Sequence, residues 1–288
     1  MSIPSISASP REVEQVNRAN ASGKQPVILV HGLWLLADSW KSWQEFFEAR
    51  GFSTVAVDWP GDQRSYTEAH ANPDTLAGLS VADIAEHVAA VIALLERKPV
   101  VIGHSLGGLL AQMIAGRGIA AATIAIDPAP CQGVLPVPLS TVKATLPVLA
   151  NPLNHGRTVT LTFDQFRYGF ANAVSESEAR HLYETIHTPA PGRPLFQAAT
   201  ANLNPWSVAK ADNLNPARGP LLVVVGEKDN IVPVTVASAA YKRQRRNGAA
   251  PTEFVVIPGA GHSLVVDGGW REVADAASVF LARQGIEA

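Results

Sequence analysis

The sequence predicts an α/β fold, in which a mostly parallel, doubly wound sheet is covered by helices on both faces. Short runs of Val, Ile, Leu and Ala recur along the chain, and such runs are typical of strands that are buried on both sides. Between them lie segments whose apolar residues repeat at helical spacing. The chain has 288 residues, of which 47% are hydrophobic and 17% charged, so it can bury a sheet of this kind.

The expected strands are the short apolar runs themselves, bounded by turn residues. From Pro26 onward each run is followed by a helical pattern, and this alternation favours a parallel sheet over an antiparallel one. The strands are expected at residues 27–30, 53–57, 99–102, 122–126, 221–225 and 254–257.

Capping residues mark where several helices should begin. Ser80 and Asp83 form an S-x-x-D pattern directly before an apolar stripe, which is typical of a capping box. Asp38 or Ser39 is expected to cap the helix that follows the first strand. A further short helix should begin at Ser9, before the first strand, so the N-terminus is expected to be short and helical.

One long segment breaks the alternation of strands and helices. Residues 128–220 contain many prolines and no run typical of a central strand, but Ser175 can cap a helix within them. The segment is too long to be a simple loop. We therefore expect an α/β core formed by residues 1–127 and 221–288, with residues 128–220 inserted as a helical cap or lid.

The motif that carries most information is Gly-His-Ser-Leu-Gly at residues 103–107. An apolar strand pattern precedes it and a helical pattern follows it, so Ser105 should lie at a sharp turn from strand to helix. The Ser105 hydroxyl would then project above the sheet beside a helix N-terminus, where backbone N–H groups favour a developing oxyanion. An ordinary turn is the alternative for the pentapeptide alone, but the flanking strand and helix favour a nucleophile.

A serine nucleophile needs a base, and the base needs an orienting acid. His262 lies in a Gly-rich loop just beyond the last expected strand, which makes it the best candidate base. Asp229 follows the preceding strand and is the preferred acid, with Asp127 and Glu227 as alternatives. Ser105, Asp229 and His262 would all lie at carboxyl ends of strands, at the same edge of the sheet.

The oxyanion requires two preorganised N–H donors. One should be the N–H of Leu106, immediately after the nucleophile, and the other the N–H of Leu33, in the loop after the first strand. Gly32 would permit close approach of that loop to the reacting carbonyl. Trp34 is either a further donor or a wall of the substrate pocket.

The cap segment offers apolar residues for such a pocket. Phe163, Phe166 and Phe170 lie at i, i+3 and i+7, on one helical face. Most of that face should pack on the core, and the remainder, together with Trp34, is expected to form an apolar pocket over Ser105. The segment has no cluster of charges, so we expect small to medium, neutral, apolar substrates.

Together with His-Gly at residues 31–32 and Asp-Trp-Pro-Gly at 58–61, these motifs resemble the α/β-hydrolase fold superfamily, in particular its esterase/lipase-like serine hydrolases with a helical lid. The resemblance runs from about residue 26 to 281 and implies hydrolysis of carboxylic esters through an acyl-enzyme. Family members commonly begin with an antiparallel strand pair, and this N-terminus is too short and helical to predict a clear one. Gln63 also replaces a Gly in the family's D-x-P-G-x-G loop.

Other functions remain open at this point. A lactonase, amidase, thioesterase, acyltransferase, perhydrolase or C–C bond hydrolase could use the same serine, and a small-molecule receptor could retain the triad. The net charge of −2 does not indicate a basic surface for binding nucleic acid. No apolar run is long enough to span a membrane. No pattern indicates a metal or a cofactor, so the expected partner is a small-molecule substrate. The oligomeric state is not indicated. With one cysteine and no visible signal peptide, a cytoplasmic protein is expected.

Overall fold

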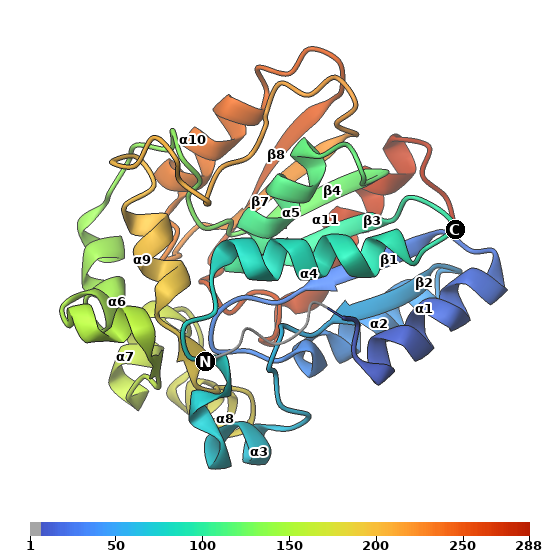
Figure 1. Cartoon of the computed structure of the whole chain (residues 1–288). Helices are drawn as coiled ribbons and strands as arrows, with labels where there is room; N and C mark the ends of the chain where they lie inside the picture. The colour runs from blue at the N-terminus through green and yellow to red at the C-terminus, as the bar shows by residue number, and fades with distance from the viewer. Residues whose placement is uncertain (1–6) are drawn as a thin grey trace.

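The computed structural model describes residues 7–288 and shows a parallel sheet with helices on both faces (Figure 1). Every pair of neighbouring strands in this six-stranded sheet runs parallel. Its strands are β1 (Pro26–Val30), β2 (Ser53–Val57), β3 (Val100–His104), β4 (Ala122–Ile126), β7 (Leu221–Gly226) and β8 (Thr252–Ile257). The expected α/β fold is therefore confirmed, and the strands lie where the apolar runs predict them.

The strand order is β2-β1-β3-β4-β7-β8. The chain thus builds outward in one direction from β1 to β2 and then in the other direction from β3 to β8. In open α/β sheets, ligands bind beyond the carboxyl ends of the strands, near the point where this direction reverses. Here that point lies between β1 and β3.

Burial explains why the strands are uninterrupted apolar runs. All residues of β1, β2, β3, β4 and β7 are buried, because helices cover both faces of the sheet. The edge strand β8 is only partly buried and carries Glu253. One face packs against α1 (Pro10–Ser22), α4 (Val81–Ala93), α5 (Leu106–Gly116) and α10 (Val234–Gln244), and the other against α2 (Lys41–Glu48) and α11 (Trp270–Arg283).

Three of the four expected caps are confirmed, including Ser175, which caps α8 (Glu176–Thr185). Ser9 caps α1 and Ser80 caps α4, each through a complete capping box. The remaining expectation is wrong, because a 3₁₀ turn (Ala37–Trp40) precedes α2 and contains both Asp38 and Ser39. The Ser39 hydroxyl instead donates to the Leu36 carbonyl at 2.7 Å.

Helix α1 occupies the place beside β2, the edge strand where the family's additional strands were expected to be missing. The carboxylate of Glu12 is buried and accepts hydrogen bonds from the backbone N–H of Asp58 and from His87. The side-chain oxygen of Gln15 accepts from the N–H of Ala56, on the outer edge of β2. Side chains of α1 thus pair two backbone N–H groups at this edge, which would otherwise be left without a partner in the sheet.

The segment between β4 and β7, residues 128–220, is mostly helical, and we call it the cap segment. In Figure 1 its helices group at the left and lower left of the sheet. Thr158 and Val159 pair with Pro191 and Ala190 in a small antiparallel sheet, which the sequence pattern did not indicate. The cap segment contains α6 (Leu139–Leu149), α7 (Phe163–Gly169), α8 (Glu176–Thr185) and α9 (Arg193–Ala199), and the short strands β5 (Thr158–Val159) and β6 (Ala190–Pro191).

His187 gives the cap segment a pH-dependent stability. Its ring is buried, stacks on Tyr183 at 4.7 Å between centroids, and accepts a hydrogen bond from the N–H of Leu161. Burial, with a smaller effect of His70, lowers the pKa of His187 from 6.5 to about 3. Between these two values the unfolded chain binds a proton that the folded chain does not, so this contribution to stability is present above pH 6.5 and is lost as the pH falls towards 3.

We therefore expect His187→Gln to reduce the acid sensitivity of folding. Lowering the pH from 6.5 to 4.5 should cost the wild type about 2 kcal/mol of unfolding free energy through this histidine, and the variant should not pay that cost. Urea unfolding at both pH values measures the difference. His181→Gln, on the exposed surface of α8, is the matched control. Equal pH dependence in wild type and His187→Gln would contradict a neutral buried imidazole.

Within residues 7–288, no helix combines the length and the apolar character that crossing a membrane requires.

Candidate active site

Ser105 lies at the turn between β3 and α5, with φ 57° and ψ −117°. This is a strained conformation for a residue with a side chain. A Cβ on Gly103 would overlap the Gly107 carbonyl, and a Cβ on Gly107 would overlap the Val30 carbonyl. The glycines therefore allow the close approach of α5 to β1 and β3 that presents Ser105. Its N–H donates to the Ile126 carbonyl at 2.9 Å.

The structure brings Ser105, His262 and Asp229 together in one hydrogen-bonded chain. His262 Nε2 lies 2.9 Å from the Ser105 hydroxyl, and His262 Nδ1 lies 2.6 Å from Asp229 Oδ2. His262 and Asp229 are buried. Because a carboxylate can only accept, His262 carries its proton on Nδ1 and donates it to Asp229. Its unprotonated Nε2 can then accept the proton of the Ser105 hydroxyl.

Asp229 is fixed by the turn after β7. Its Oδ1 accepts from the N–H groups of Ile231 and Val232 at 2.7 and 2.8 Å, which orients Oδ2 towards His262. Glu227 is exposed and instead accepts from the N–H of Gly259. Of the three carboxyl groups considered from the sequence, Asp229 has the geometry of an orienting acid. Asp127 lies farther away, with its Oδ2 3.8 Å from His262 Nδ1.

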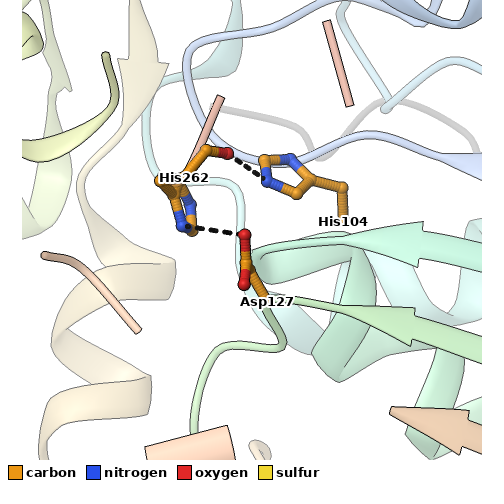
Figure 2. A group of neighbouring side chains, drawn as sticks. All are labelled: His104, Asp127 and His262. Carbon is orange, nitrogen blue, oxygen red and sulfur yellow. Dashed lines mark hydrogen bonds and ion pairs between the residues drawn. The ribbon is translucent and has the colours of Figure 1, made fainter. Parts of the chain in front are cut away.

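His104 supports the loop of the base. Figure 2 shows its ring beside His262, where Nε2–H donates to the His262 carbonyl oxygen at 2.9 Å. Burial, and then the charge of His262, lowers the pKa of His104 well below its ordinary value, so it is neutral at pH 7. No local sequence pattern indicates this role of His104, because the hydrogen bond joins residues 158 positions apart.

A nitrogen or oxygen atom from each of His104, Asp127 and His262 lies within 4.8 Å of the others, which is close enough for metal ligands (Figure 2). Both ring nitrogens of His262, however, already bond to Ser105 and Asp229. A metal bound through His262 would have to displace one of these partners. The donor set therefore fits proton transfer from a serine better than metal binding.

The two amides expected at the oxyanion lie on either side of Ser105. Leu106 is the first residue of α5, so its N–H has no acceptor within the helix. No hydrogen bond within residues 7–288 uses the N–H of Leu33. A Cβ on Gly32 would lie 2.8 Å from Ser105 Cβ, which shows how closely the Leu33 loop approaches the serine. Within the described residues, both amides are therefore available as donors beside Ser105.

Side chains from the loop after β2 hold the Leu33 loop in place. His31 stacks on Trp59 at 4.5 Å between ring centroids, and its Nε2 lies 3.0 Å from Asp62 Oδ2. The same Asp62 oxygen accepts from the N–H of Trp59 at 2.6 Å. Gln63, which replaces a family glycine, donates to the Gly61 carbonyl and closes the turn. The substitution therefore leaves a compact loop.

Trp34 connects the Leu33 loop to the cap segment. It has a left-handed backbone, with φ 65°, which is unusual for a bulky residue. Its carbonyl accepts from the N–H of Thr188 at 3.0 Å, and its indole N–H donates to the Val159 carbonyl at 3.1 Å. The indole N–H is thus already engaged, and Trp34 lines the apolar cavity beside Ser105.

An apolar cavity of about 190 Å³ reaches Ser105 from the cap segment. Leu33, Trp34 and Leu106 form its floor beside the serine. The rest of its wall comes chiefly from α6, α9 and the turn after β7. Exposed apolar residues of its lining mark where the cavity meets the surface. These are Val137, Val142 and Leu146.

The polar side chains of this cavity, apart from Ser105, are hydrogen-bonded to the backbone. The Thr141 hydroxyl donates to the Ile231 carbonyl and the Thr145 hydroxyl to the Thr141 carbonyl. The Asn202 side-chain oxygen accepts from the N–H of Gly133, and its NH₂ group donates to the Val134 carbonyl. A ligand in the cavity therefore meets apolar walls, and its polar contacts concentrate at the serine.

The three cap phenylalanines do not line this cavity, which corrects the expectation. Phe166 and Phe170 are fully buried, but they pack behind the base, with Phe170 at 5.6 Å from the His262 ring. Phe163 packs on Tyr183. Helix α7 faces the His262 side, whereas the cavity lies against α6 and α9. The spacing of Thr141, Val142, Thr145, Leu146 and Leu149 on α6 is the sequence signal that could have identified the wall.

Comparison with known proteins supports the fold and identifies the family. Non-heme chloroperoxidase of Burkholderia pyrrocinia is 28% identical over 269 residues, which cover 84% of this chain and 86% of that protein. Among solved structures, the monoacylglycerol lipase of Paleococcus ferrophilus superposes with a TM-score of 0.62 at 21% identity, covering 90% of this chain and 94% of that one. The bromoperoxidase of Bacillus anthracis gives 0.64 at 18% identity, covering 90% and 92%. Residues 27–276 match the alpha/beta hydrolase family, and the chain belongs to that family.

Proposed function

We propose that this protein is a serine hydrolase that cleaves carboxylic esters of small to medium, neutral, apolar substrates through an acyl-enzyme. One observation carries the proposal: the hydrogen-bonded chain of Ser105, His262 and Asp229 opens onto a cavity whose walls are apolar. An activated serine at the end of an apolar pocket suits a substrate with one polar, electrophilic carbon and an apolar acyl or alcohol group.

The geometry supports a two-step reaction. The Ser105 oxygen attacks the ester carbonyl while His262 Nε2 takes its proton, and the carbonyl oxygen becomes an oxyanion held by the N–H groups of Leu33 and Leu106. The tetrahedral intermediate collapses when His262 gives that proton to the leaving alkoxide. His262 then takes a proton from a water molecule as the water attacks the acyl carbon. When this second tetrahedral intermediate collapses, His262 returns the proton to the Ser105 oxygen, and the acid leaves. Asp229 keeps His262 in the required tautomer throughout.

The apolar walls predict a dependence on acyl length. Each methylene that enters the cavity should contribute about 0.8 kcal/mol, so kcat/KM should rise about threefold to fourfold for each added methylene until the cavity is filled. Nitrophenyl esters from acetate to hexanoate measure this series. A flat series, or a best rate for an ionised substrate, would contradict an apolar pocket.

A cavity-filling variant sharpens this test. Ala198, on α9, lines the cavity and is buried. Ala198→Leu should shift the best substrate to a shorter ester and leave the rate with acetate nearly unchanged, because the short acyl group does not reach the added side chain. A receptor that retains the triad would instead bind these compounds without turnover.

The likeness to the chloroperoxidase favours a second candidate, perhydrolysis. Hydrogen peroxide could replace water in the second step, in which case the acyl-enzyme would yield a peracid and free Ser105. Peracid formation from a short-chain ester and hydrogen peroxide, compared with acid formation in water, separates the two activities. Loss of both in Ser105→Ala would show that they share one acyl-enzyme.

A further inference from the structure

A second carboxyl group lies beside the imidazole of His262, and the mechanism above does not use it. Asp127 follows β4 and is fully buried. Its Oδ1 accepts from the N–H of Gly226 at 2.8 Å. Its Oδ2 lies 3.8 Å from His262 Nδ1 and has no hydrogen-bond partner within residues 7–288 (Figure 2). Asp229 Oδ2 lies 2.6 Å from the same nitrogen.

Two buried carboxylates cannot both ionise easily around a single imidazole N–H. Within residues 7–288, neither Asp127 nor Asp229 forms an ion pair with Lys or Arg, so His262 is the one partner of both. The other titratable groups nearby do not supply a positive charge. They are Asp267, which is acidic, and His104, which is neutral. One of the two carboxyl groups must therefore keep its proton.

The hydrogen-bond donors show which group that is. Asp229 accepts two backbone N–H bonds through one oxygen and the His262 bond through the other, so both of its oxygens already serve as acceptors. Asp127 accepts one N–H bond and leaves its other oxygen unpaired. Burial, and then the negative charge of Asp229, raises the pKa of Asp127 well above its ordinary value. A protonated Oδ2 would also resolve the missing hydrogen bond, because it could donate to Asp229.

We infer that Asp127 is a positioning residue that stays protonated and donates to the ionised Asp229, and that it replaces Asp229 as the acid partner of His262 when Asp229 loses its charge. The inference rests on the proposed function only in taking Ser105 as the nucleophile. When position 229 is neutral, Asp127 no longer faces a like charge, so it can ionise. A shift of about 1 Å would then bring its oxygen within hydrogen-bond distance of His262 Nδ1.

The test measures how fast Ser105 reacts with a fluorophosphonate, because this probe reports an activated serine whatever ester the protein prefers. Asp127→Ala removes the donated hydrogen bond and should slow the reaction about tenfold to a hundredfold. Asp127→Asn carries an N–H₂ group in the same place and should restore the rate to within about threefold of wild type. Failure of the Asn variant to restore the rate would overturn the inference.

The dependence of the labelling rate on pH distinguishes a protonated Asp127 from an ionised one, which a loss of stability alone would not do. If Asp127 is neutral, Asp127→Asn removes no charge, and the acid limb of the rate profile should keep its midpoint. If Asp127 is ionised, the same change removes a negative charge 3.8 Å from the imidazole, and the limb should move to lower pH by about one unit or more. Such a shift would also overturn the inference.

The double variant tests replacement. Asp229→Asn alone should lower the rate about 10²-fold, less than the roughly 10⁴-fold expected when the base loses its orienting acid. Adding Asp127→Asn to this variant should remove the acid that replaces Asp229. The double variant should therefore react about 10⁴-fold more slowly than wild type. A double variant that reacts as fast as Asp229→Asn would overturn the inference that Asp127 replaces Asp229 as the acid partner of His262. Wild type that reacts with the probe but cleaves no ester would refute the proposed function alone, since the inference is judged on the labelling rates.

Discussion

Ser105→Ala should lower kcat by about 10⁴ to 10⁶ while substrate binding is largely retained. The variant keeps the cavity, the two amides and the His262–Asp229 pair, but it has no atom that can form the acyl-enzyme. Hydrolysis of nitrophenyl butyrate measures the loss, and tryptophan fluorescence can report binding because Trp34 lines the cavity. Ser22→Ala, an exposed serine at the end of α1, is the control for the substitution itself.

His262→Ala should cause a loss of similar size, because the serine then has no base. The two changes act on one proton transfer, so their effects should not add when combined. Turnover within tenfold of wild type in Ser105→Ala would exclude Ser105 as the nucleophile. A double variant much slower than either single variant would show that the two residues act independently, which contradicts the 2.9 Å hydrogen bond between them.

The sequence predicted those parts of the molecule that leave a local pattern. Strands buried on both faces must be apolar throughout, so their positions could be read from the chain. Ser105 and Asp229 each follow such a strand, and His262 follows the partly buried edge strand β8. Parallel strands bring their carboxyl ends to one edge of the sheet. Their proximity could therefore be inferred from order alone, although their roles stay a proposal.

What the sequence could not show depends on distances between segments. The spacing of Phe166 and Phe170 indicates one inward face of a helix, but it does not say whether that face meets the cavity or the back of His262. The state of Asp127 depends on how near it lies to Asp229. The roles of His104 and of Trp34 likewise arise from contacts between distant parts of the chain. The division into a core and a cap segment stays a prediction.

Gly107→Ala should impair both folding and catalysis, although alanine is the better helix former. Gly107 lies in the first turn of α5, where alanine would favour the helix by about 1 kcal/mol. The added Cβ, however, would overlap the Val30 carbonyl and would lie 2.6 Å from the His31 carbonyl oxygen. Both are backbone atoms at the end of a buried strand, so neither can move without shifting β1 or the Leu33 loop.

The clash should exceed the gain in helix propensity, because overpacking against a rigid backbone costs about 3 kcal/mol or more. Any relief would separate α5 from β1 and so move the N–H of Leu106 away from that of Leu33. A displacement of about 1 Å at these donors should lower kcat about 10²-fold in the molecules that still fold. Urea unfolding and ester hydrolysis measure the two effects on the same preparation. Gly156→Ala is the matched control, since its Cβ would meet no atom within 4 Å. Wild-type stability and activity in Gly107→Ala would mean that α5 and β1 do not pack as closely as the active-site geometry requires.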